Sequence, residues 1–113
     1  MDTIKTINSE TLRNWLEAGK PVSILDIRPI QERVESYIPQ SIYFNAYDKL
    51  KANDKTALQG LNLDKNIPVV AFCAGGKTSL IAAELLQNQG YEAYSLDGGM
   101  KGWSSFNNTA QNE

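Results

Sequence analysis

The fold class of this chain follows from one stretch of its sequence, in which an apolar run leads directly into a glycine turn and then into a helix. Residues 67–72 read Ile-Pro-Val-Val-Ala-Phe, a composition typical of a strand buried on both faces. The segment 79–89 places its leucines and alanines at helical spacing and is closed by Gly90. A doubly buried strand followed by a helix predicts a parallel sheet covered by helices on both sides.

The rest of the chain continues this alternation. Further strands are expected over 3–7, 22–27, 41–44 and 91–96. Further helices are expected after a cap at Ser9, and over 30–35 and 100–106. The polar segment 45–66, with scattered leucines, reads as a loop with helical turns. Because 113 residues hold one core, we expect a single domain over 1–106 and a flexible polar tail over 107–113.

The charge balance and the apolar segments exclude several classes of partner. The net charge is −2 and the basic residues are spread along the chain, which gives no reason to expect nucleic acid binding. The longest apolar stretches, such as Val22–Leu25 and Val69–Ala74, are too short to span a bilayer. The first residues lack the layout of a secretory signal, so we expect a cytoplasmic protein without membrane contact. The sequence does not set the oligomeric state.

The counts of two residue types narrow the chemistry further. The chain contains no histidine, which excludes a Ser-His-Asp triad, a Cys-His pair and any His-ligated metal site within it. Cys73 is its only cysteine, which excludes an internal disulfide, a resolving thiol and a thiolate zinc cage. We therefore expect no metal and no cofactor, and a nucleophile that backbone dipoles, positive charge or the substrate must activate.

Cys73 lies at the position where an open parallel sheet binds ligands, directly after a buried strand and before a helix. The first amides of a helix have no acceptor within it, and Gly75 and Gly76 allow the backbone to curl these amides into an anion-binding nest. Such a nest favours a thiolate or a persulfide. Lys77 could add positive charge. The hydroxyls of Thr78 and Ser79 could donate to the sulfur, cap the helix, or do both.

The loop also allows two other interpretations. A free cysteine is often a small buried apolar residue, so Cys73 could be purely structural. The run Gly76-Lys77-Thr78 also matches the end of a phosphate-binding loop of nucleotide-hydrolysing proteins. That motif requires a glycine where this chain has Ala71, and no acidic strand downstream offers a magnesium ligand. The nucleotide-binding interpretation therefore fails.

The region around Cys73 resembles the active-site segment of rhodanese domains. The matching residues are Val70-Ala71-Phe72-Cys73, Gly76, Thr78, Ser79, Ala82-Ala83, Leu86, Gly90-Tyr91, Leu96, Gly98-Gly99 and Trp103. A second stretch resembles the other signature of this family through Leu25-Asp26-Ile27-Arg28, Glu32, Ile38-Pro39 and Ser41-Ile42. The resemblance runs from about Ile4 to Trp103, and two motifs in the right order make it specific.

The resemblance implies a five-stranded parallel sheet flanked by helices, and transfer of sulfane sulfur from a donor such as thiosulfate to a thiol or cyanide. Cys73 would be the nucleophile that carries the persulfide, and the amides of residues 74–79 (Ala74, Gly75, Gly76, Lys77, Thr78 and Ser79) would form its cradle. Related phosphatases have a loop one residue longer that closes with arginine. Here Ser79 occupies that position, so the sequence favours a sulfurtransferase over a phosphatase.

Some features depart from the family pattern or allow two interpretations. The family often has Gly-His-Ile-Pro-Gly where this chain has Ser-Tyr-Ile-Pro-Gln over 36–40. Arg28 could lie beside the active loop, but we favour a structural role in which Asp26 and Arg28 bond to backbone and to Glu32. An alternative to the enzyme is a persulfide carrier without turnover or a regulatory docking module, either of which could belong to a larger protein.

Overall fold

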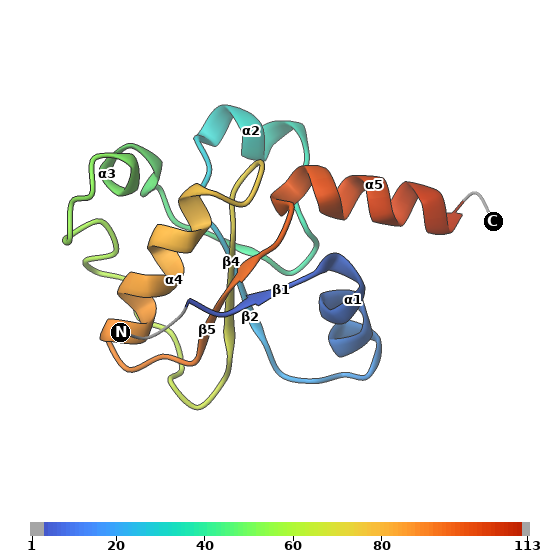
Figure 1. Ribbon diagram of the computed structural model, residues 1–113, viewed down its shortest axis with the longest axis horizontal. Helices are drawn as coiled ribbons and strands as arrows, with labels where there is room; N and C mark the ends of the chain where they lie inside the picture. The colour runs from blue at the N-terminus through green and yellow to red at the C-terminus, as the bar shows by residue number, and fades with distance from the viewer. Residues whose placement is uncertain (1–3, 112–113) are drawn as a thin grey trace.

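All five strands in the computed structural model, which describes residues 4–111, run parallel in one sheet (Figure 1). The strands are β1 (Thr6–Ile7), β2 (Ser23–Asp26), β3 (Ile42–Tyr43), β4 (Val69–Phe72) and β5 (Ala93–Leu96). Their order across the sheet is β1-β5-β4-β2-β3. The predicted α/β fold with a five-stranded parallel sheet is confirmed.

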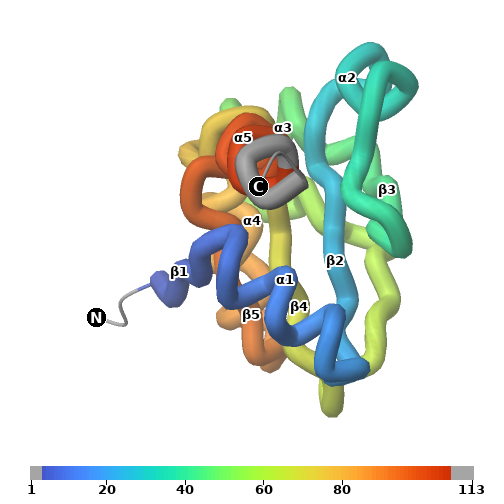
Figure 2. Tube along the Cα trace, turned by 90° about the vertical axis from the view of Figure 1, so that its right-hand side faces the viewer, coloured from blue at the N-terminus to red at the C-terminus, as the bar shows by residue number. Residues whose placement is uncertain are grey.

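Five helices accompany the strands in this part of the chain: α1 (Ser9–Glu17), α2 (Ile30–Glu35), α3 (Tyr47–Lys51), α4 (Thr78–Asn88) and α5 (Gly99–Gln111). In Figures 1 and 2, α3 and α4 lie on one side of the strands and α1 and α5 on the other. The predicted cover of both faces is therefore confirmed. None of the helices described between residues 4 and 111 has the length and hydrophobicity needed to cross a membrane.

The position of β4 at the centre of the sheet explains why its sequence is uniformly apolar. Its alternate residues point to opposite faces and join two separate cores. Val69 and Ala71 pack with α3 and α4, whereas Val70 and Phe72 pack with α1 and α5. All four side chains are fully buried. A polar residue on either face of this strand would lie in one of the cores.

Two neighbouring strands end together and bring distant segments to the same edge of the sheet. Asp26 pairs with Phe72 at the last register position of β2 and β4, and the amide of Ile27 donates to the carbonyl of Phe72. The segments after these strands therefore leave the sheet side by side. α2, which buries none of its residues, lies at this carboxyl edge (Figure 1).

Two local predictions are corrected. The cap of α1 is Asn8 rather than Ser9, because the extended backbone of Asn8 places its side-chain oxygen 2.8 Å from the amide nitrogen of Thr11. α5 continues to Gln111 instead of ending at residue 106, so most of the predicted tail over 107–113 is helical. No glycine or proline interrupts this stretch, and the Asn107 side chain donates to the carbonyl of Trp103 one turn back. Residues 112–113 lie outside the described part, and the flexibility of the tail stays a prediction.

Candidate active site

Cys73 lies at the start of the loop that joins β4 to α4, and backbone donors surround its sulfur. The Sγ atom accepts from the amide nitrogens of Gly76, at 3.1 Å, and Ser79, at 3.4 Å. Gly76 has a φ of +102°, which only glycine adopts readily, and this turn directs its amide back to the sulfur. Of the six cradle residues predicted from the sequence, these two supply amide contacts. Such donors stabilise a negatively charged sulfur.

A pair of buried hydroxyls lies behind the sulfur. The Oγ atom of Ser79 is 3.4 Å from Cys73 Sγ and 2.7 Å from the Oγ atom of Ser95. Both serines have no exposed surface. Sequence analysis missed Ser95, although a serine within the apolar strand β5 is a signal that its hydroxyl needs a buried partner. The Cys73 thiol donates to the Ser79 oxygen, which also shares a hydrogen bond with Ser95.

The start of α5 supports the loop from below. The amides of Met100 and Lys101 donate to the carbonyls of Cys73 and Ala74 at 2.8 and 3.0 Å. Gly99 precedes them with a φ of +58°. Gly99 allows this close approach, because the α5 amides reach the loop only where no side chain intervenes.

A cavity of about 330 Å³ opens above Cys73, and we call it the donor cavity. Its lining residues are Tyr47, Lys51, Cys73, Ala74, Gly75, Lys77 and Thr78. Cys73 itself is only 3% exposed, so its sulfur lies at the floor of this cavity. Two lysines and no carboxylate are among the lining residues, a balance that favours a small anionic ligand.

Lys51 is the second residue that sequence analysis missed. It belongs to α3, in the polar segment whose placement over the site the sequence did not predict. No local pattern distinguishes Lys51 from Lys49 or Lys55, because only the packing of α3 against α4 brings it to the cavity. Tyr47 of the same helix lines the cavity, whereas Tyr43 instead donates its hydroxyl to the carbonyl of Arg28.

Asp26 and Arg28 form a buried ion pair beside the loop. The Nε and Nη2 atoms of Arg28 donate to the two carboxylate oxygens of Asp26 at 2.9 and 2.8 Å, and Nη2 also donates to the carbonyl of Ser36 at 2.7 Å. The hydrogen bonds to Asp26 raise the pKa of Arg28 above its usual value, against the effect of burial. Glu32, the partner expected from the sequence, forms no hydrogen bond with Arg28 among the contacts of the described residues and acts on it only as a nearby charge.

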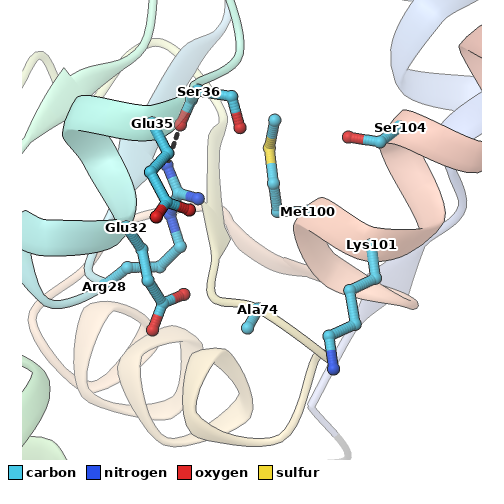
Figure 3. Close-up of a pocket in the computed structure, with 8 residues that line it drawn as sticks. All are labelled: Arg28, Glu32, Glu35, Ser36, Ala74, Met100, Lys101 and Ser104. Atoms are coloured by element: carbon cyan, nitrogen blue, oxygen red, sulfur yellow. Dashed lines mark hydrogen bonds between the residues drawn. The ribbon is translucent and has the colours of Figure 1, made fainter.

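Arg28 also borders a second cavity, which we call the side cavity (Figure 3). This cavity measures about 260 Å³ and is lined by Arg28, Glu32, Glu35, Ser36, Ala74, Met100, Lys101 and Ser104. Ala74 lines both cavities, so they meet at the residue that follows Cys73. Arg28 thus anchors the segment after β2 and lines the same cavity as Ala74 of the active loop, and a role for it in the reaction stays a prediction.

The comparisons with known proteins agree with this arrangement. The model of the rhodanese-like domain family matches residues 8–106. The chain is 28% identical over 100 residues to a Bacillus subtilis protein named "Putative sulfurtransferase YtwF", covering 88% of this chain and 90% of that protein. It is 32% identical over 77 residues to a tRNA sulfurtransferase of Desulfurococcus amylolyticus, covering 68% of this chain and 14% of that protein.

A solved structure gives the same result at the level of the fold. The crystal structure of a rhodanese-like domain protein from Staphylococcus aureus matches this chain with a TM-score of 0.71 and 32% sequence identity. The match covers 88% of this chain and 91% of that protein. Because the family model spans strands β2 to β5, the Cys73 loop and most of α5, the chain belongs to the rhodanese-like domain family.

Proposed function

We propose that this domain is a sulfurtransferase that moves sulfane sulfur from a small anionic donor such as thiosulfate, through a persulfide on Cys73, to a thiol or cyanide. The observation that carries the proposal is the placement of Cys73 Sγ within reach of two backbone amides, at the floor of a cavity lined by Lys51 and Lys77. The family and the names of two relatives support the same reaction class.

The first half-reaction charges the cysteine. The Cys73 thiolate attacks the outer sulfur of thiosulfate, the S–S bond of the donor breaks, and its electron pair leaves with sulfite: Cys73–S⁻ + S–SO₃²⁻ → Cys73–S–S⁻ + SO₃²⁻. The amides of Gly76 and Ser79 hold the negative charge on the attacking sulfur. Lys51 and Lys77 hold the sulfonate group and the departing sulfite.

The second half-reaction needs an external acceptor, because the chain has no other cysteine to attack the persulfide. A thiolate or cyanide takes the outer sulfur, and the electron pair of the persulfide bond returns to Cys73 Sγ. The chain thus supplies one nucleophile that is regenerated in each cycle, and the acceptor determines the product.

Intact mass spectrometry tests the proposal. Incubation with thiosulfate should add the mass of one sulfur atom to the wild-type protein, and cyanide should then remove it. The Cys73→Ser variant should gain nothing under the same conditions. If the wild-type mass stays unchanged with both thiosulfate and methanethiosulfonate as donors, the sulfurtransferase proposal is wrong.

The burial of Cys73 favours one second candidate, a persulfide carrier that delivers sulfur to a single docked partner. With Cys73 only 3% exposed, acceptors too large for the donor cavity cannot reach the persulfide unless the loop is rearranged on docking. Loading by thiosulfate without turnover on free thiols or cyanide would favour the carrier, whereas repeated turnover would favour the enzyme.

A further inference from the structure

The side cavity combines charges of both signs, unlike the donor cavity. α2 contributes Glu32 and Glu35 to one wall, and α5 contributes Lys101 and Ser104 to the opposite wall (Figure 3). Neither glutamate forms an ion pair with any residue between 4 and 111. Their carboxylates are therefore available to a ligand that carries a positive charge.

Arg28 gives the same cavity a buried cationic group. Its side chain is only 3% exposed, and its Nε and Nη2 atoms are engaged by Asp26 and Ser36. Nη1 has no hydrogen-bond partner among the residues that the structure describes, and the guanidinium borders the cavity beside Ser36 (Figure 3). No fully buried side-chain nitrogen or oxygen of the described residues lacks a hydrogen-bond partner, so Nη1 is not sealed off from the cavity. A carboxylate is the ligand that a guanidinium binds best.

A ligand that fits this cavity must carry a cation and an anion close together. A volume of about 260 Å³ suits a small molecule, with the two glutamates on one side and Arg28 and Lys101 available to an anion. The α-amino-acid group, with its ammonium and carboxylate on one carbon, has this chemistry. A ligand with only one of the two charges would be repelled by the lining residues of the same sign, and it would have no second charge whose attraction offsets that repulsion.

We propose that the side cavity binds the α-amino-acid head group of the thiol that accepts the sulfur. This inference rests on the proposed function and adds the class of the acceptor. Ala74 lines both cavities, so an acceptor held by its head group in the side cavity extends its thiol across Ala74 to the persulfide on Cys73. The step is RS⁻ + Cys73–S–SH → RS–SH + Cys73–S⁻, in which a new S–S bond forms and the electron pair of the old one returns to Cys73.

The test isolates the acceptor step. Protein loaded with thiosulfate is desalted and mixed with one acceptor, and the loss of the added sulfur is followed by intact mass. L-cysteine and L-homocysteine carry the whole head group with two different reaches. Cysteamine lacks the carboxylate, 3-mercaptopropionate lacks the amine, and 2-mercaptoethanol lacks both. Rate constants are expressed per thiolate, because the intrinsic acidity of the five thiols differs.

At least one of the two amino acids should react about three- to tenfold faster than each of the three thiols that lack the ammonium group, the carboxylate or both. This is the range expected for one or two partly exposed ionic contacts. Glu32→Gln and Glu35→Gln should lower the rate with that amino acid, relative to the rate with cyanide, by about threefold each. Glu84→Gln serves as the matched control, because Glu84 is exposed on α4 and lines neither cavity. In this variant the ratio of the rate with the amino acid to the rate with cyanide should equal that of the wild type.

The two levels of the proposal fail in different ways. If thiosulfate does not load the wild-type protein, the proposed function fails before any acceptor is tested. If loading occurs but all five thiols react equally per thiolate, or the Glu32 and Glu35 variants keep the wild-type ratio, the acceptor site is wrong and the sulfurtransferase proposal stands.

Discussion

The backbone amide of Met100 donates to the carbonyl oxygen of Cys73 at 2.8 Å, which ties the start of α5 to the loop that begins at the cysteine. The contact is possible because Gly99 has no side chain. A Cβ atom there would overlap the Cys73 carbonyl and lie 2.7 Å from the carbonyl oxygen of Ala74. The active loop is thus held between the amides of its own helix and those of α5.

Gly99→Ala should therefore destabilise the protein and disturb the loop. The substitution combines a φ of +58° with a backbone clash, and we expect a loss of about 2–4 kcal/mol in the free energy of unfolding. Gly75→Ala is the matched control within the same loop, because a Cβ there meets nothing within 4 Å. Urea denaturation measures both variants. Equal stability of the two would show that α5 does not constrain the loop.

Removing either buried hydroxyl near the sulfur should slow persulfide formation. Ser79→Ala deletes the hydroxyl that faces Sγ, and Ser95→Ala leaves that hydroxyl without the partner that orients it. We expect a loss of about tenfold for Ser79→Ala and a smaller loss for Ser95→Ala, measured as the single-turnover rate with thiosulfate.

The double variant separates a positioning role from a general structural effect. If Ser95 acts through Ser79, adding Ser95→Ala to Ser79→Ala should slow the reaction little further. Ser105→Ala, at an exposed position of α5, controls for the loss of a hydroxyl elsewhere and should react at the wild-type rate. Fully additive losses in the double variant would contradict the coupling of the two serines.

Lys51 and Lys77 should both contribute to binding of an anionic donor. Lys51→Met and Lys77→Met should each raise the KM for thiosulfate about three- to fivefold, and the rise should shrink as potassium chloride is added, because salt screens exposed charges. Lys49→Met is the control, since Lys49 lies on the same helix and does not line the donor cavity. If Lys51→Met behaves like Lys49→Met, α3 takes no part in donor binding.

The ion pair of Asp26 with Arg28 should matter more for stability than any surface pair. Asp26→Asn removes the carboxylate that Arg28 and Arg33 contact and leaves a buried guanidinium without compensation. We expect a loss of about 3–5 kcal/mol in the free energy of unfolding. Glu17→Gln, which breaks the exposed pair with Arg13, should cost about 0.5 kcal/mol or less. A loss below 1 kcal/mol for Asp26→Asn, about the upper limit for an exposed pair, would refute this structural role.

The parts of the site that were predictable from the sequence lie within one short segment. Cys73, Gly76 and Ser79 fall between the end of a strand and the first turn of a helix, so local geometry alone brings the two amides to the sulfur. The alternation of buried strands and helices likewise fixes the fold class, because a strand with two apolar faces needs helices on both. The two wrong predictions, the cap of α1 and the end of α5, concern helix ends, where several neighbouring residues fit the sequence patterns for a helix boundary equally well.

The remaining features of the site depend on segments that meet only after folding. Lys51, Ser95 and Met100 reach the loop from α3, β5 and α5, and no spacing along the chain links them to Cys73. Local sequence determines which groups share one turn or one strand. The packing of helices onto both faces of the sheet decides which turns meet, because that packing depends on the shapes of all the buried side chains together. Local sequence therefore sets Cys73 beside the amides of its own loop, whereas the charges around it depend on how helices from elsewhere in the chain pack onto the sheet.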